Sequence, residues 1–390
     1  MSKPNIKTFG TTYNYLNDPA LRTKETNDSL LTIKGALFSG VNFQYLTWRN
    51  IHFVDCDFAG GYEIKLEAMA NCVFEGCKIV GIHDFGEMNS VRFYKYLSGS
   101  NSNWGGNVGS KNVMFEECQF IGDTPDRNHQ GAIGTYGEAS FLNCKMKWFG
   151  ITGDTGVTIK GCELEDVNCS PNASKGDGAP VLIENSKLRG TFDMVPASLQ
   201  SLTIRDTVID NLDLSGATIK GDTLMERVVA DRMNLAVTSG GAISLRSVKV
   251  NGSGQKVFYL AANRFSSVLL DDCTVSANLE GERAWIGGAP TEPAYAAQPP
   301  WSQSVTFRNS TLPRLDASYL NTARLLIENT AFNHLVMSHA RVGSMVFIGA
   351  QFSVALDLSN AQVKQFKHSG GTPLKKLAGL KLDGSNVKLN

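Results

Sequence analysis

The sequence has few charged residues and no excess of either sign. Asp, Glu, Lys and Arg make up 19% of the 390 residues, and 37 basic residues balance 37 acidic ones. Nucleic-acid-binding proteins usually carry a basic excess, and proteins that imitate DNA carry an acidic one. The balance therefore favours a partner other than nucleic acid, although a local patch can still be present in a neutral chain.

Long apolar runs are also missing. No stretch approaches the roughly eighteen consecutive apolar residues that a membrane-spanning helix needs. The first residues, MSKPNIKTFGTTYNYL, lack the charged start and apolar centre of a secretory signal peptide. We therefore expect no transmembrane segment, and a protein that is cytoplasmic or exported by a specialised system without a Sec signal.

Helical periodicity is the third absence. A globular α/β fold would place amphipathic helices of roughly 10–15 residues between its strands, and outside the two ends the sequence has none. The 38 glycines and the frequent asparagines favour many turns instead. These features predict an all-β chain.

What the sequence does contain is a five-residue repeat. From Ser310 it divides without a slip into STLPR, LDASY, LNTAR, LLIEN, TAFNH, LVMSH, ARVGS, MVFIG and AQFSV. Shorter runs of the same kind begin at Ala36 and Thr207. The first and third residues of each unit are small or apolar. They share one side of an extended backbone, because successive side chains of a strand alternate between its two sides.

A longer period lies on top of the five-residue units. One small or β-branched residue, called the anchor here, recurs at intervals mostly close to 20, with one interval of 41 that corresponds to two coils and one of 37. The interval of 37 is compatible with one coil plus an insertion or with two short coils. The anchors are Ala36, Cys56, Cys77, Cys118, Cys144, Cys162, Ser186, Thr207, Val228, Val248, Cys273, Ser310, Thr330 and Ala350.

Four extended triplets and four turns close one coil of twenty residues, and each coil can then hydrogen-bond to the next. The prediction is a right-handed parallel β-helix of quadrilateral section, with about sixteen coils over residues 31–366, since stacked repeats bury a core that one repeat cannot.

These units resemble the pentapeptide-repeat family, in which a small residue precedes a central Leu or Phe by two positions. ALF, CDF, TAF and AQF match that pattern, and the resemblance is clear over 36–60, 202–235 and 310–365. Residues 62–200 are equally compatible with a looser β-helix of the pectate-lyase type. The resemblance implies the fold but no single function, because the family serves many roles.

The eight cysteines receive a structural interpretation from the repeat. Six of them are anchors and Cys72 lies one unit before Cys77, so we expect inward-facing, reduced thiols that pack as small hydrophobes. Cys169 falls outside the frame and is the expected exposed thiol. The interpretation predicts no metal site and no cofactor.

The ends of a β-helix expose unpaired backbone and must be covered. Asp18-Pro19 and Thr372-Pro373 each precede a short helical pattern, so we expect caps at 1–30 and 367–390. The family resemblance implies that a homodimer can form through the C-terminal cap. It also implies that the N-terminal segment is a delivery signal if the protein is a bacterial effector.

Residues beyond the regular coils cluster at 82–112, 121–137, 166–179, 252–265 and 281–303. If the coils stay in register, these insertions emerge along one edge as a continuous binding surface. The aromatic residues expected on that surface are Tyr94, Tyr96, Trp104, Tyr136, Trp148, Trp285 and Trp301.

Three functions compete. The first is a non-enzymatic interaction or scaffold protein of a bacterium or phage, with a protein partner, since no nucleophile elbow, phosphate-binding loop or metal motif is present. The second is a carbohydrate-active or glycan-binding β-helix, which needs paired carboxylates in an aromatic groove. Its candidate residues are Asp84, Glu87, Asp123, Asp126, Arg127 and His129.

The third is protection of a topoisomerase by imitation of DNA, known for some pentapeptide-repeat proteins. That mechanism needs a continuous acidic face. Glu163, Glu165 and Asp166 cluster in the sequence, but Lys145, Lys147 and Lys160 lie close by.

Overall fold

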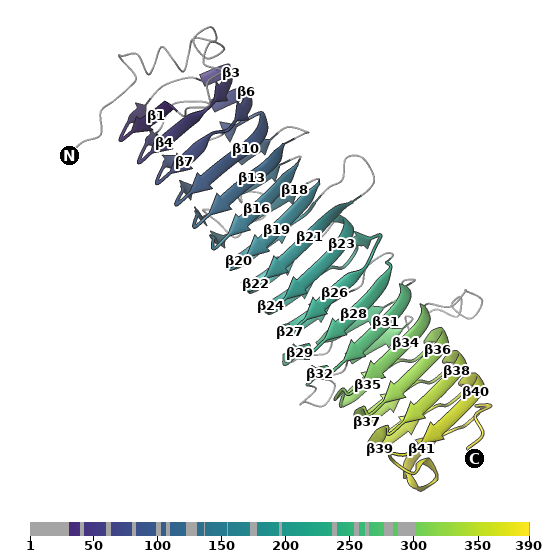
Figure 1. The fold of residues 1–390 in the computed structure, drawn as a ribbon. Helices are drawn as coiled ribbons and strands as arrows, with labels where there is room; N and C mark the ends of the chain where they lie inside the picture. The colour runs from purple at the N-terminus through teal and green to yellow at the C-terminus, as the bar shows by residue number, and fades with distance from the viewer. Residues whose placement is uncertain are drawn as a thin grey trace. The chain divides into compact units, whose positions relative to one another are not determined.

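The computed structural model describes residues 31–39, 43–59, 64–79, 83–98, 103–106, 110–121, 131–135, 137–153, 155–171, 178–194, 197–235, 240–252, 257–261, 265–276, 284–287 and 302–389. They form two compact units, Met1–Asp193 and Met194–Asn390. The described residues are nearly all β, in stacked parallel strands that form a β-solenoid (Figure 1). Their only helix is the single 3-10 turn η2 (Leu374–Lys376), which is far too short to cross a membrane.

The first unit has three stacks of parallel strands, named faces A, B and C. Face A contains β1 (Leu31–Lys34), β4 (Ile51–Val54), β7 (Val73–Glu75), β10 (Glu87–Tyr94), β13 (Lys111–Glu116), β16 (Glu138–Leu142), β19 (Gly156–Lys160) and β21 (Ala179–Glu184). Face B contains β2 (Leu37–Ser39), β5 (Asp57–Ala59), β8 (Lys78–Ile79), β11 (Leu97–Ser98), β14 (Gln119–Ile121), β17 (Lys145–Lys147), β20 (Glu163–Cys169) and β22 (Lys187–Asp193). Face C contains β3 (Phe43–Arg49), β6 (Ile64–Ala70), β9 (His83–Asp84), β12 (Asn103–Gly106), β15 (Gly131–Thr135) and β18 (Phe149–Gly153).

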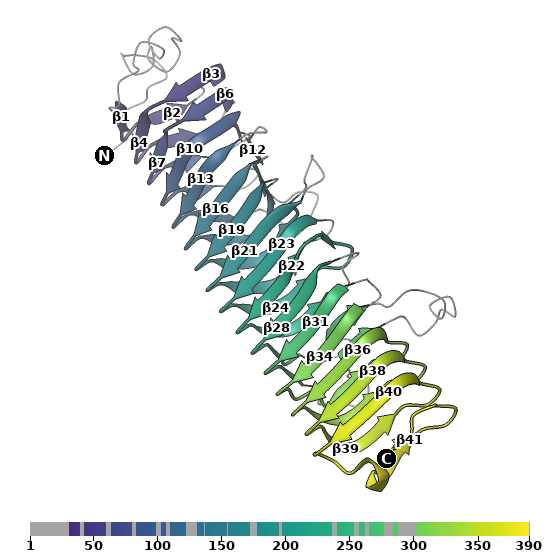
Figure 2. The ribbon, with the colours of Figure 1, turned by 45° about the vertical axis from the view of Figure 1, so that its right-hand side comes forward.

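The second unit is likewise a stack of parallel strands (Figure 2). Its face A contains β23 (Ser198–Arg205), β26 (Thr223–Glu226), β28 (Ala242–Arg246), β31 (Phe265–Asp271), β34 (Ser302–Arg308), β36 (Asn321–Glu328), β38 (Arg341–Ile348) and β40 (Gln362–Ser369). The remaining strands are β24 (Val208–Asp213), β25 (Thr218–Ile219), β27 (Val229–Asn234), β29 (Lys249–Val250), β30 (Phe258–Ala261), β32 (Thr274–Val275), β33 (Ala284–Gly287), β35 (Arg314–Asp316), β37 (Ala331–Val336), β39 (Gln351–Asp357) and β41 (Gly379–Lys381).

The register between neighbouring strands confirms the parallel β-helix. Leu31 pairs with Ile51, and Leu325 pairs with Met345, each one coil of twenty residues later. Other coils are longer, as where Val113 pairs with Ala139. The right-handed sense and the number of coils in the whole chain stay predictions.

Burial follows the five-residue frame in the run from Ser310. The inward residues there are pairs at the first and third positions of successive units, and the frame shifts by one residue only after Phe352. The buried residues at these two positions are Ser310, Leu312, Leu315, Ala317, Leu320, Thr322, Leu325, Ile327, Thr330, Phe332, Leu335, Met337, Ala340, Val342, Met345, Phe347, Ala350 and Phe352. Asp316 and Ser318 are buried as well, at other positions of their unit. The assignment of inward residues from the sequence is therefore confirmed.

Each coil turns from face A to face B at a residue with positive φ, directly before the anchor. A left-handed backbone is easiest for Gly and next for Asn and Asp, which explains why these residues dominate the position. The corner residues are Gly35, Asp55, Gly76, Lys95, Glu117, Asn143, Gly161, Asn185, Asp206, Arg227, Ser247, Asp272, Asn309, Asn329, Gly349 and Gly370.

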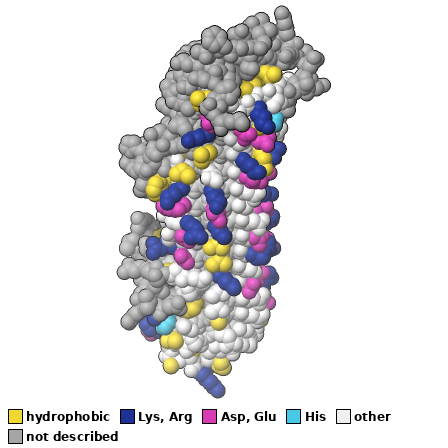
Figure 3. All heavy atoms as spheres, turned by 90° about the vertical axis from the view of Figure 1, so that its left-hand side faces the viewer, with side chains coloured by type: hydrophobic (Ala, Val, Ile, Leu, Met, Phe, Trp, Pro, Cys, Tyr) yellow, Lys and Arg dark blue, Asp and Glu magenta, His cyan; other side chains and the backbone are white. Residues whose placement is uncertain are grey.

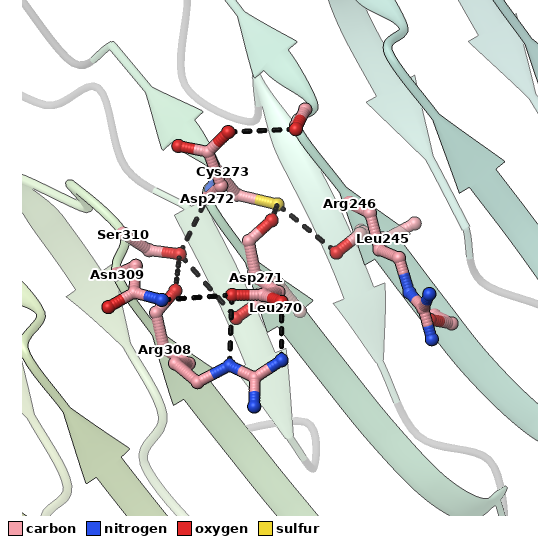
Figure 4. A network of polar contacts seen from close by, with 11 residues as sticks. Leu245, Arg246, Leu270, Asp271, Asp272, Cys273, Arg308, Asn309 and Ser310 are labelled. Carbon is pink, nitrogen blue, oxygen red and sulfur yellow. Dashed lines mark hydrogen bonds and ion pairs between the residues drawn. The ribbon is translucent and has the colours of Figure 1, made fainter.

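The anchor side chain satisfies the backbone at this corner. Thr330 Oγ1 donates to the carbonyl oxygen of Glu328 at 2.9 Å, and Cys118 Sγ approaches that of Glu116 at 3.3 Å. Figure 4 shows the same arrangement at Ser310, whose Oγ contacts the carbonyl oxygen of Arg308 at 2.7 Å and accepts from the Cys273 backbone N–H at 3.0 Å. Each of these carbonyls also accepts a backbone N–H, so the side chain of the anchor supplies a second donor, and Cys, Ser and Thr share that role.

All eight cysteines are reduced and buried, as expected for core thiols. The expectation of an exposed Cys169 is wrong, because that side chain is fully buried. Strand β20 continues past the frame break, and Val167 and Cys169 both turn inward, with Cys169 in register with Ile151 of face C.

The expected insertion at 82–112 is also wrong in most of its length, because β9 to β12 make a regular coil there. Tyr96 occupies the missing anchor position of that coil, between Cys77 and Cys118. The interval of 37 residues is one coil with an insertion, since Thr274 pairs directly with Thr311. The other expected insertions lie in part outside the described residues, at 122–130, 136, 172–177, 253–256, 262–264, 281–283 and 288–301.

The expected N-terminal cap at 1–30 lies outside the described residues. At the C-terminal end the β-structure runs beyond 366, because β40 extends to Ser369 and β41 pairs with β39. The expected helix after Pro373 is the single turn η2.

Candidate functional site

The C-terminal end of the second unit leaves part of face A without a covering strand. Strand β40 pairs with β38 on one side, and Phe347 is in register with His368. Phe366 and His368 therefore occupy inward positions, yet both are only half-buried. The next strand in the chain, β41, covers β39 instead.

The backbone of β40 is consequently open beyond its first residues. Asn386 accepts from the Val363 N–H through its side chain at 2.7 Å and donates its own N–H to Ala361. From Lys364 to Ser369, no backbone hydrogen bond to a later segment occurs among the described residues. An unpaired edge of this kind is a template for another strand.

A hollow of about 890 Å³ lies at this end. Its walls are partly apolar, and Ile348 in them is 40% exposed. The lining residues are Val346, Ile348, Phe366, Lys367, His368, Ser369, Gly370, Gly371, Pro373, Leu374, Lys375, Lys376, Lys388 and Leu389.

Four lysines line this hollow, and no acidic side chain of the described residues does. Lys367, Lys375, Lys376 and Lys388 are exposed, and none of them has an ion pair within the described part of the chain. Residues 364–390 contain six lysines and one acidic residue, Asp383, in a chain of zero net charge. The hollow is therefore a local concentration of positive charge.

His368 adds an unsatisfied polar atom to the same lining. Its Nε2 is shielded from solvent and has no hydrogen-bond partner among the described residues. In the preceding coils the equivalent inward position holds Phe347, Ile327 and Phe307. A polar ring at an apolar position is costly without a partner, which marks this end as different from the interior of the stack.

Many charges elsewhere on the described surface are paired between neighbouring coils. Lys147 lies 2.6 Å from Glu165, Lys160 lies 3.0 Å from Glu184, and Arg308 lies 2.5 Å from Asp271. Figure 3 shows basic side chains next to acidic ones over the face in view. In the cluster considered for DNA imitation, Glu163 lies 3.4 Å from Lys145, so its acidic residues alternate with lysines.

The Asp271–Arg308 pair spans the coil that carries the long insertion. The guanidinium donates through Nε and Nη2 to the two carboxylate oxygens, and Asn309 donates to the same carboxylate (Figure 4). These hydrogen bonds hold the pKa of Asp271 below its usual range, with Arg308 as the main cause.

The aromatic residues expected on one binding surface are dispersed. Tyr96 is buried as an anchor and takes no part in a surface. Tyr94 is half-buried beneath Arg92 and Lys95, and Trp148 lies under Lys147, whose Nζ is 4.4 Å from the ring centre. Only the backbone is described for Trp104 in β12 and Trp285 in β33, and Tyr136 and Trp301 lie outside the described residues.

The carboxylates proposed for glycan chemistry are only partly described. Asp84 ends β9, in register with Lys65 and Gly105, and Glu87 begins β10 as an exposed residue. Asp123, Asp126, Arg127 and His129 lie outside the described residues. The described part of the chain contains no group of three side chains suited to hold a metal ion.

Comparison with known proteins gives no family for this chain. No family model, no curated protein and no solved structure matches it. Fold and site together define a parallel β-solenoid protein whose C-terminal end carries a lysine-lined hollow beside an open strand edge.

Proposed function

We propose that this chain is a non-enzymatic interaction protein and that it binds a protein partner at the C-terminal hollow. The observation that carries this proposal is the contrast in pairing. The lysines of the hollow have no ion pair among the described residues, whereas basic residues along both units repeatedly pair with the neighbouring coil. Exposed apolar side chains rimmed by charge are typical of a binding surface.

The described carboxylates support a structural rather than a chemical role. Glu163, Glu165 and Asp271 each bind a basic side chain of an adjacent coil. The described cysteines support it too, because burial raises the pKa of the Cys72 and Cys169 thiols to about 12 and leaves them poor nucleophiles.

We also propose that the chain is a member of the pentapeptide-repeat family. This membership is supported by the inward pairs at five-residue spacing between Ser310 and Phe352. A role as an exported bacterial effector, and a site of action inside or outside the cell of origin, are further proposals that the family resemblance implies.

Site-specific photo-crosslinking tests the proposed function. A photoreactive amino acid replaces Ile348, which lines the hollow, or Val208, which is 49% exposed and lies outside its lining. In a lysate of the source organism we expect a discrete crosslinked protein from position 348 only. Crosslinks from position 208 alone, or from neither position, would contradict the proposal.

A deletion of residues 82–137 is a poor alternative test. This segment includes β10 to β15, which are stacked strands of the first unit, so its removal would disturb the fold. Single substitutions on the surface avoid that difficulty.

A further inference from the structure

We propose that the occupant of the C-terminal hollow is an extended acidic segment of a partner protein that adds one parallel strand to β40. The inference rests on the proposed function and specifies it, since it names the chemistry and the backbone geometry of the docking segment. Three features of the C-terminal end carry it: the open edge, the inward side chains and the unpaired lysines.

The open edge supplies main-chain hydrogen bonds. Strand β40 is eight residues long, and its N-terminal end is already covered by Asn386. The stretch from Lys364 to Ser369 offers its outer N–H and C=O groups at the place where the next coil would lie, about 4.8 Å away. Strand addition to an exposed edge is a common mode of peptide recognition.

The inward side chains set which residues the added strand presents to the core. Phe366 and His368 point the same way as Met345 and Phe347 of the preceding coil, and both are half-covered. An added strand would cover them with every second side chain. Apolar residues at those positions would bury the exposed part of Phe366.

The lysines set the charge of the other side chains. At several places along the stack a basic residue of one coil meets an acidic residue of the next, as for Lys145 with Glu163 and Lys160 with Glu184. Lys367 faces outward on β40, and among the described residues no strand pairs with the other side of β40 to supply a carboxylate. The rim of the hollow also carries Lys375, Lys376 and Lys388, which would likewise attract carboxylates. Acidic residues should therefore alternate with apolar ones in the partner segment.

A second copy of this chain is a poorer occupant for reasons of charge. Contact between two C-terminal ends would bring two sets of these lysines together, and like charges at close range repel. Self-association is therefore an outcome that the experiment must detect.

The test is fluorescence anisotropy with the full-length protein and labelled seven-residue peptides. The probe alternates Val and Glu, the charge control alternates Val and Lys, and the backbone control replaces each Val of the probe with Pro, which cannot donate to an edge. We expect the Val-Glu peptide to bind at least about tenfold more tightly than either control. Only this peptide can both pair its carboxylates with the lysines and form main-chain hydrogen bonds with the edge of β40.

Variants of the protein locate the binding. The double variant Lys367→Glu/Lys376→Glu should weaken binding of the Val-Glu peptide at least about tenfold through like-charge repulsion. The matched control is Lys249→Glu, an exposed lysine on β29 outside the hollow, which should leave binding unchanged. Circular dichroism and thermal unfolding show whether each variant is folded.

Equal binding of the Val-Glu and Val-Lys peptides, equal binding of the Pro peptide, or insensitivity to the double variant would each overturn the inference. Dimerisation that buries position 348 would also overturn it, in favour of a second copy. If position 348 still crosslinks a partner that the Val-Glu peptide does not displace, the proposed function stands and this inference fails.

Discussion

The two units build the same backbone around different cores. In the first unit, the inward position of face A is a stack of phenylalanines from Phe53 to Phe141, with ring centres 4.9–5.0 Å apart. In the second unit, the equivalent position begins with Ile204, Met225, Leu245 and Leu270. The anchors differ as well, since cysteine dominates in the first unit and Thr, Val, Ser or Ala in the second.

This difference shows that the coil does not depend on one kind of core side chain. Both units keep the positive-φ corner before the anchor, and both keep parallel register from coil to coil. The corner and the ladder hydrogen bonds define the path of the chain, and apolar residues of suitable volume fill the space inside it. The following predictions test that interpretation.

The largest expected effect is the loss of an aromatic ring from the stack. Phe93 stacks on Phe74 and Phe115 and is fully buried, so Phe93→Ala should cost about 3–5 kcal/mol. Leu245→Ala, at the equivalent position of the second unit, should cost about 1 kcal/mol less, because it breaks no ring stacking. Denaturant unfolding, followed unit by unit through hydrogen exchange, measures both. A smaller loss for Phe93→Ala than for Leu245→Ala would contradict this comparison.

The second prediction concerns the hydrogen bond of the anchor. Thr330→Val keeps the shape but removes the hydroxyl that donates to the Glu328 carbonyl and accepts from the buried Ser310 N–H, so it should destabilise the second unit by about 1–3 kcal/mol. The matched control is Val228→Thr, at a buried anchor that lacks a hydroxyl, which should be neutral or stabilising. If the two substitutions destabilise equally, the anchor side chain contributes packing and its hydrogen bonds contribute nothing measurable.

The third prediction is a pH dependence in the Asp271–Arg308 contact. Because Arg308 lowers the pKa of Asp271 in the folded state, the contact stabilises the fold above the ordinary carboxyl pKa. That contribution is lost as the pH falls through the lowered value. Asp271→Asn should therefore be less stable than the wild type at neutral pH, with the difference closing in acid. A difference that persists unchanged below about pH 2 would contradict the sign.

The smallest expected effect is on the thiols, which should not react while the chain is folded. Burial raises the pKa of Cys169 and Cys72 to about 12 and that of Cys273 to about 11. Iodoacetamide at about pH 8 should label these cysteines only after denaturation, as mass spectrometry can show. Rapid labelling of Cys169 in the folded protein would show that this thiol is exposed and would contradict the prediction.

The sequence was sufficient to predict the parallel β-helix, the inward residues from Ser310 to Phe352 and most anchors. It was insufficient where a coil departs from the frame. The pattern places Tyr96 on the surface, because a large side chain stands at an anchor position that is otherwise small, whereas the structure buries it. The hydrogen bonds of the anchors depend on the corner geometry, and their only signal in the sequence is a Ser, Thr or Cys that often follows Asn, Asp or Gly.

The candidate site could not be located by pattern alone. The lysines of residues 364–390 are visible in the sequence, but their isolation depends on which strand ends the stack. Nothing in the repeat indicates that β41 covers β39 and leaves β40 open. His368 likewise resembles an ordinary polar residue until its register with Phe347 places it inward.

Amide hydrogen exchange across the last coils tests the central claim most directly. The account predicts slow exchange in β38 (Arg341–Ile348), which pairs with β36 and with β40. It predicts fast exchange for those amides between Lys364 and Ser369 of β40 that point away from β38. These amides should become protected when the Val-Glu peptide is added. Protection of β40 equal to that of β38 in the free protein would contradict it.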